Sequence, residues 1–141
     1  MPNAGFVHLH VHSAYSLLQG AMTIKKLGEL AKADHQPALA LTDTDNMFGA
    51  LEFSDKMAGS GIQPIIGCAI SVDFGDHDPS SRTAALSAPA RIVLLAMREA
   101  GYRSLMRLSS RAFLETPVNE APHLKIEWLE NGAADGLIGV T

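Results

Sequence analysis

Cysteine, tryptophan and charged residues are all scarce in this chain of 141 residues. The one cysteine, Cys68, cannot form an internal disulfide, which is typical of proteins in a reducing compartment. Charged residues make up 18% of the sequence, and no apolar run reaches the roughly 20 residues that a membrane-spanning helix needs. The first residues also lack the basic and apolar regions of a secretory signal. We therefore expect a cytoplasmic protein.

Positive charge is too sparse for a surface that grips nucleic acid. The formal net charge is −4, whereas a domain that holds DNA by its phosphates usually carries a basic patch. The clustered basic residues are two adjacent lysines and a loose row of arginines, namely Lys25, Lys26, Arg98, Arg103, Arg107 and Arg111. The row could contact DNA or a partner protein, but its spacing favours a solvated helix face. We expect weak DNA binding.

Short apolar segments alternate with amphipathic ones along the chain, and this alternation predicts the α/β class. The expected strands cover residues 6–10, 38–42, 64–72, 92–96 and 136–140. The expected helices cover residues 24–33 with Thr23 as N-cap, 48–57, 99–114 and 126–130. Continuous apolar strands of this kind are typical of parallel sheets covered by helices. Residues 75–89 are polar and rich in turn formers, which predicts a flexible surface loop.

The last expected strand, residues 136–140, has no helix after it. A parallel strand needs a neighbouring strand and a covering helix, so we interpret residues 1–141 as a segment of a single domain that is truncated at its C-terminal end. An apolar strand edge without a partner pairs readily with another chain. We therefore expect the segment to self-associate, with a symmetric dimer as the commonest form.

Three histidines alternate near the end of the first expected strand. Side chains two residues apart leave a strand on the same face, so His8, His10 and His12 could share one face. Neutral imidazole is the commonest metal ligand, and the ends of strands in β/α repeats form active sites. His10 and His12 are the candidate pair of ligands, with His8 as a possible third. The alternative is a hydrated strand end with incidental histidines.

Beyond the histidines, several segments resemble one family in their order and spacing. These segments are 6–18 (FVHLHVHSAYSLL), 37–43, 46–53, 61–68, 93–96, 101–102 and 136–138. Together they are similar to the polymerase-and-histidinol-phosphatase (PHP) domain, in the form that opens the alpha subunit of bacterial DNA polymerase III. The resemblance implies a distorted barrel of seven β/α units that can hold several metal ions. It also implies a long parent chain with DNA-directed DNA polymerase activity in chromosome replication, whose Mg²⁺-dependent polymerase site lies outside this segment.

Departures from the family pattern decide how the metal site is interpreted. His10 and His12 match the first ligand pair of the family, whereas Gln19, Thr44 and Ala69 stand where the family prefers an acidic residue, a histidine and a glutamate. The resemblance therefore implies a vestigial site without Zn²⁺ or Mn²⁺ and without catalytic residues. The role would be structural, or docking of other polymerase III subunits such as the proofreading exonuclease. The alternatives are a metal-dependent phosphoesterase or 3′–5′ proofreading nuclease of the same family, or the error-prone alpha paralogue.

Other polar and aromatic residues have simpler interpretations. Asp43, Asp45 and Asn46 could bind metal, but such residues before a helix usually cap it, and we favour the cap. Cys68 lacks a catalytic pattern around it and is interpreted as a small buried core residue. Trp128 could stack on a base, but one aromatic residue without basic neighbours is more often a packing residue.

Overall fold

The computed structural model describes residues 5–75 and 90–141 of the chain. Helices and strands alternate in the order α1 (Ile24–Ala33), β1 (Ala38–Leu41), α2 (Ala50–Gly59), β2 (Gln63–Asp73), β3 (Ala90–Ala96), α3 (Glu99–Glu115), β4 (Leu124–Lys125), the 3₁₀ helix η1 (Ile126–Leu129) and β5 (Leu137–Val140). In the described part, no helix is both long and apolar enough to cross a membrane. Apart from Gly75, the expected loop over residues 75–89 lies outside the described residues.

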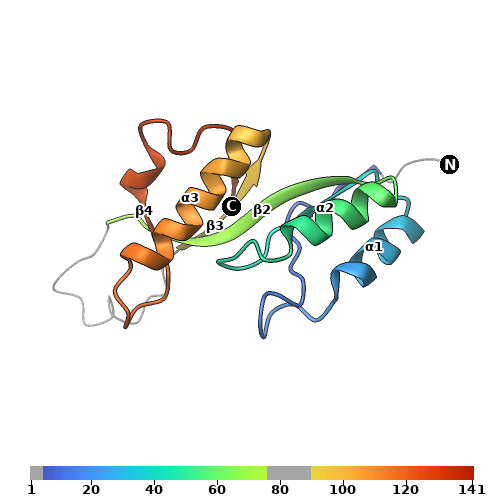
Figure 1. The fold of residues 1–141 in the computed structure, drawn as a ribbon, viewed down its shortest axis with the longest axis horizontal. Coiled ribbons are helices and arrows are strands. Elements are labelled where there is room, and N and C mark those ends of the chain that lie inside the picture. Colours follow the sequence, from blue (N-terminus) through green and yellow to red (C-terminus); the bar gives the residue numbers. More distant parts are fainter. Residues whose placement is uncertain (1–4, 76–89) are drawn as a thin grey trace.

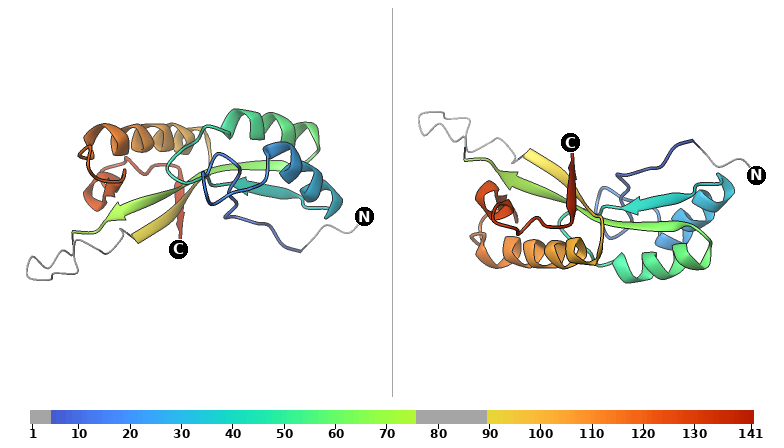
Figure 2. Two further views of the ribbon diagram at one scale, coloured as in Figure 1. Left: turned by 90° about the horizontal axis from the view of Figure 1, so that it is seen from below. Right: turned by 90° about the horizontal axis from the view of Figure 1, so that it is seen from above.

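The α/β class is confirmed, and the sheet is mixed. The strands lie in the order β1-β2-β3-β5, and β4 pairs with the end of β2. The β1–β2 and β2–β4 pairs are parallel, as expected, but β3 runs antiparallel to both β2 and β5. Both arrangements bury apolar strands in the same way, so the apolar pattern alone did not separate them. Figure 2 shows α2 and α3 on the same face of this sheet.

Strand β2 links the two halves of the molecule. Its first residues, up to Ile66, pair with β1, and its later residues, from Gly67, pair with β3. A side chain at Gly67 would place its Cβ 2.6 Å from the carbonyl oxygen of Leu94. Glycine is therefore required where β2 changes partner, because only the missing Cβ allows β3 to approach. The long ribbon of β2 between α2 and α3 is visible in Figure 1.

The expected strand over residues 6–10 is wrong. Two backbone hydrogen bonds connect residues 8–11 to β1 and the residue that follows it. They run from Ala40 N–H to the His8 carbonyl (3.0 Å) and from Thr42 N–H to the Val11 carbonyl (2.8 Å). The two acceptors, His8 and Val11, are three residues apart, whereas the two donors, Ala40 and Thr42, are two residues apart. The two segments therefore do not keep the constant register of a regular strand pair. Val11 N–H bonds to the Thr42 hydroxyl at 3.0 Å instead of a backbone carbonyl. A regular ladder therefore does not form.

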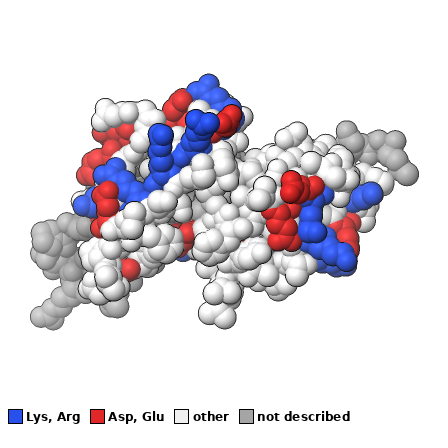
Figure 3. All heavy atoms as spheres, in the orientation of Figure 1, with Lys and Arg blue, Asp and Glu red and all other residues white. Residues whose placement is uncertain are grey.

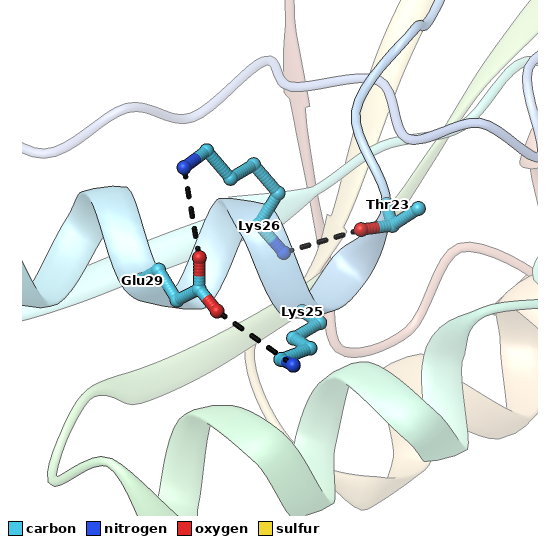
Figure 4. A network of polar contacts seen from close by, with 4 residues as sticks. All are labelled: Thr23, Lys25, Lys26 and Glu29. Carbon is cyan, nitrogen blue, oxygen red and sulfur yellow. Dashed lines mark hydrogen bonds and ion pairs between the residues drawn. The ribbon is translucent and has the colours of Figure 1, made fainter.

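Helix α1 begins where the sequence predicts it. The Thr23 hydroxyl accepts a hydrogen bond from Lys26 N–H at 3.3 Å, which satisfies one free donor of the first turn. Figure 4 shows this cap together with the ion pairs that Glu29 makes with Lys25 and Lys26 at 4.0 and 3.6 Å. These pairs are exposed, so each contributes well under about 1 kcal/mol. Burial of the apolar face is the larger stabilising effect.

The core has two main clusters, one in each half. The first joins α1, α2 and β1 and includes Ile24, Leu27, Leu39, Phe53 and Met57. The second joins α3 to β2, β3 and β4 and includes Cys68, Ile70, Leu94, Leu105, Leu108 and Leu124. A smaller cluster of Ala40, Ala69, Val93 and Leu95 joins β1, β2 and β3. Ala69 is also one of the candidate-site positions, so the candidate site adjoins this cluster.

Candidate functional site

Asp43, at the end of β1, holds the loop of residues 13–20 against the sheet. Its side chain is 1% exposed. One carboxylate oxygen accepts from Ser13 N–H and the Ser16 hydroxyl, both at 2.6 Å, and the other accepts from the Ser13 hydroxyl at 2.7 Å. Hydrogen bonds to a carboxylate are stronger than neutral ones. This arrangement explains how a nearly inaccessible carboxylate is accommodated beside the core.

The helix cap expected at residues 43–46 is wrong. The residue before α2 is Gly49, and no side chain caps the helix there. Asn46 instead closes its own turn, because its side-chain oxygen accepts from Phe48 N–H at 3.2 Å. Its amide group donates to the Tyr15 carbonyl at 3.1 Å and to the Thr44 carbonyl at 3.0 Å. The turn therefore fastens the loop rather than the helix.

The structure brings His10 and His12 together. Their ring centroids are 4.9 Å apart, with an angle of 75° between the planes. Burial, with a smaller contribution from His10, lowers the pKa of His12, so its imidazole is neutral at pH 7, the form that ligates metals. His8 instead packs edge-on against Phe6, with centroids 4.8 Å apart. Within residues 5–75 and 90–141, no group of three or more His, Cys, Asp or Glu side chains could hold a metal ion.

The three positions that depart from the family pattern also meet at one corner. The Thr44 hydroxyl donates to the Gln19 side-chain oxygen at 2.6 Å. Thr44 forms an isolated parallel bridge with Ala69, which is fully buried. Backbone bonds on either side close this contact, from Ala69 N–H to the Asp43 carbonyl (3.0 Å) and from Asp45 N–H to the Ala69 carbonyl (2.9 Å). The amide, hydroxyl and methyl group are thus neighbours in space.

This donor set does not fit a catalytic metal site. A catalytic Zn²⁺ usually takes three protein ligands and a water. Two imidazoles are available, but both oxygens of Asp43 already accept hydrogen bonds. The Thr44 hydroxyl is bonded to Gln19, and the Ala69 methyl group offers no donor atom. Within the described residues, this corner therefore offers no group of three side chains of the kind that a metal cluster requires.

Asp45 is a partly buried acid at this corner. Its φ of 56° lies in the left-handed region, which Asp, Asn and His adopt more readily than other residues with a side chain. Its Oδ1 atom is buried and has no hydrogen-bond partner. Burial raises the pKa of this carboxyl, and the positive charge of Arg91 offsets part of the effect. Asp45 is thus neither the cap nor part of a metal-binding group.

Cys68 and Trp128 are packing residues. Cys68 is 1% exposed, and burial raises the pKa of its thiol to about 12. Such a thiol is not a nucleophile at neutral pH, so its interpretation as a core residue is confirmed. Trp128 packs against the second cluster. The Arg111 guanidinium lies 4.0 Å from its ring centroid, a basic neighbour that the sequence did not suggest.

The arginine row of α3 is largely neutralised by acids. Ion pairs join Arg98 to Asp135, Arg103 to Glu99 and Arg111 to Glu115 at 2.6, 2.6 and 2.7 Å. Figure 3 shows the positive atoms over α3 interleaved with negative ones, and an uncharged surface between them and the charges of α1 and α2. The face is therefore solvated and mixed in sign, and it is not a basic stripe.

Sequence reasoning missed the two serines that organise the site. Ser13 and Ser16 are buried at 0% and 2% exposure, and Ser16 is bonded to Asp43, to Thr44 N–H (2.9 Å) and to His12 Nδ1 (3.3 Å). A signal was available. An aspartate directly after a buried strand needs donors, and the two serines follow His12 within four residues.

Comparisons with known proteins identify the family of this chain. The model of the PHP domain family matches residues 8–141. DNA polymerase III subunit alpha of Caulobacter vibrioides is 45% identical over 135 residues, and that of Treponema pallidum is 46% identical over 121 residues. These matches cover 95% and 82% of this chain, which spans only 11% and 10% of the two relatives.

Two solved structures have a similar fold. An amidohydrolase from Chromobacterium violaceum, solved with bound sulfate and no metal, has a TM-score of 0.56 and 29% identity, and the match covers 75% of this chain and 32% of that one. A protein from Bifidobacterium adolescentis described as a metal-dependent phosphoesterase has a TM-score of 0.56 and 15% identity, over 79% of this chain and 34% of that one. Because the family model matches residues 8–141, which is nearly the whole chain, the chain belongs to the PHP domain family.

Proposed function

We propose that this chain is the N-terminal PHP segment of a replicative DNA polymerase III alpha subunit. Support comes from the 45% and 46% identity to the alpha subunits of two bacteria. In this proposal, DNA-templated DNA synthesis is carried out by the parent chain in the cytoplasm. The proposal also places the polymerase site and its Mg²⁺ outside these 141 residues. The segment itself contains no residue of that reaction.

The PHP corner of this chain, in our proposal, is inactive and serves structure or partner docking. The observation that carries this proposal is the hydrogen bond of 2.6 Å between Thr44 and Gln19. Both residues stand at expected ligand positions, and their side chains form a hydrogen bond with each other instead of binding a metal ion. Without a metal ion there is no activated water to attack a phosphate ester. The docking partner would be another polymerase III subunit, such as the proofreading exonuclease.

A hydrolysis assay tests this proposal. The chain is incubated with p-nitrophenyl phosphate, and separately with DNA carrying a mismatched 3′ end, in the presence of Mn²⁺ or Zn²⁺. We expect no product above the level given by the His10→Ala variant. The variant carrying Thr44→His and Ala69→Glu should bind metal more tightly than the unmodified chain, because two donor side chains are restored. Metal-dependent release of phosphate or nucleotide by the unmodified chain, lost in His10→Ala, would contradict the proposal.

The second candidate is a working phosphoesterase or 3′–5′ nuclease of the PHP family. It is favoured by the adjacent imidazoles of His10 and His12 at 4.9 Å, which remain as a ligand pair. The fold similarity to a phosphoesterase is compatible with it. The same assay separates the two candidates, because only the second predicts turnover that depends on His10.

A further inference from the structure

The loop of residues 13–20 is held in place mainly by polar contacts, with one edge-on ring contact between Tyr15 and Phe48 at 6.5 Å between centroids. Its tip exposes two neighbouring apolar side chains, Leu17 at 82% and Leu18 at 106% of full exposure. Leu18 also has a φ of 65°, a conformation that costs a leucine energy and persists only where the surroundings impose it. Figure 1 shows this loop projecting from the molecule just before α1. Its shape therefore has to be imposed by its anchors.

The base of the loop is closed tightly. Ala14 N–H donates to the Met22 carbonyl at 2.9 Å, and Gly20 N–H donates to the Ser16 carbonyl at 2.9 Å. A Cβ at Gly20 would lie 2.0 Å from the Ser13 carbonyl oxygen. Glycine is required here, because the two ends of the loop are in direct backbone contact at Ser13 and Gly20.

The Ser16 hydroxyl is the centre of the anchor. It has one proton to donate and two lone pairs that accept. The proton goes to Asp43 at 2.6 Å, and one lone pair accepts from Thr44 N–H at 2.9 Å. The remaining lone pair faces His12 Nδ1 at 3.3 Å and accepts a hydrogen bond when that nitrogen carries a proton. Every bonding position of this hydroxyl is then used.

We propose that Thr44 and Gln19, which stand at two positions of metal ligands, complete a hydrogen-bonded clamp that holds loop 13–20 in place without a metal ion. The clamp consists of Ser16, bonded to Asp43, His12 and Thr44, and of the outer bond between Thr44 and Gln19. A metal ion would cross-link the same segments through ligands at these positions. In this chain the Thr44–Gln19 bond makes that cross-link. The inference rests on the proposed absence of metal from the site.

Amide hydrogen exchange in the 141-residue chain tests the clamp. The readout is the exchange rate of Ala14 and Gly20, whose N–H groups close the loop. Thr44→Val keeps the shape of the side chain and removes the hydroxyl, so both amides should exchange about three- to tenfold faster, the factor that one net hydrogen bond supports. Thr44→Ser keeps the hydroxyl and should exchange at nearly the wild-type rate. Gln63→Leu, at an exposed glutamine in β2, is the matched control for Gln19→Leu.

A double-mutant cycle shows whether Thr44 and Gln19 act as a pair. Gln19→Leu should accelerate exchange as Thr44→Val does, and the double variant should be no faster than either single variant, because all three lack the same bond. Additive effects would contradict the clamp, and so would unchanged exchange in Thr44→Val.

A chelator separates this inference from the proposed function. Exchange of the wild-type loop should be the same with and without EDTA. Faster exchange in EDTA would show that a metal ion holds the loop and would overturn both. Unchanged exchange in EDTA, combined with no effect of Thr44→Val, would overturn the clamp alone.

Discussion

Replacing Asp43 with alanine removes the acceptor of three buried hydrogen bonds. The donors are Ser13 N–H, the Ser13 hydroxyl and the Ser16 hydroxyl, at 2.6 to 2.7 Å. A hydrogen bond to a charged group contributes about 1.5–3 kcal/mol, and a donor left unsatisfied costs about 1–3 kcal/mol. Because the hydroxyls can rotate toward other acceptors, we expect a loss of about 3–5 kcal/mol in the free energy of unfolding, at the upper end for point variants.

Urea denaturation followed by circular dichroism measures this loss. Asp43→Asn keeps the shape and one oxygen acceptor, so it should lose less, about 1–2 kcal/mol. It also provides a readable variant if Asp43→Ala does not fold. Asp55→Ala, at an exposed acid of α2, is the control and should stay within about 0.5 kcal/mol of wild type. A loss below about 1 kcal/mol for Asp43→Ala, on the scale of one neutral hydrogen bond, would refute Asp43 as the anchor of the loop.

Three further predictions concern DNA binding, the free edge of the sheet and the buried carboxyl of Asp45. In a fluorescence anisotropy titration at physiological salt, the chain should bind duplex DNA with a dissociation constant of about 1 µM or higher, which is the range of non-specific binding. A lower dissociation constant would contradict this prediction. Light scattering over a dilution series should detect a dimer that Ile138→Lys weakens and Val118→Lys does not, because in the described chain β5 pairs only with β3 and Ile138 is 47% exposed. A monomer at about 100 µM would contradict this prediction, because the dissociation constant of any dimer would then exceed that concentration. Asp45→Asn should raise the free energy of unfolding at pH 7, and by less near pH 4. The pKa of Asp45 is raised in the native state, so the native state loses stability as pH rises and the carboxyl ionises. An unchanged or lower free energy of unfolding for this variant at pH 7 would contradict the prediction.

Local signals in the sequence predicted most of the elements. Thr23 marks the start of α1 because its hydroxyl caps the first turn, and the apolar segments around Leu39, Ile70 and Leu94 form strands as expected. The direction of β3 was not predictable, since a buried strand shows the same apolar pattern in either orientation. The segment before Val11 has a strand-like sequence, but its pairing with β1 is interrupted by the Thr42 hydroxyl.

The site was predicted as a set of positions but not as a network. The resemblance identified Gln19, Thr44 and Ala69 as departures, and the structure places them at one corner. That Thr44 bonds to Gln19 depends on the approach of a loop and a turn 25 residues apart, which composition and spacing do not encode. Asp43 was misassigned as a cap for the same reason, because its donors come from residues 30 and 27 positions earlier.

Whether the PHP corner binds metal is decided by measuring the metal content of the chain. The chain is dialysed against trace Zn²⁺ and Mn²⁺, and the bound metal is measured by mass spectrometry alongside the His10→Ala variant. We expect substoichiometric metal that does not change in His10→Ala, because two imidazoles without a third protein ligand make a weak site. Two or more ions retained per chain, and lost in His10→Ala, would contradict it and would show that the PHP corner of this chain is still a working metal site.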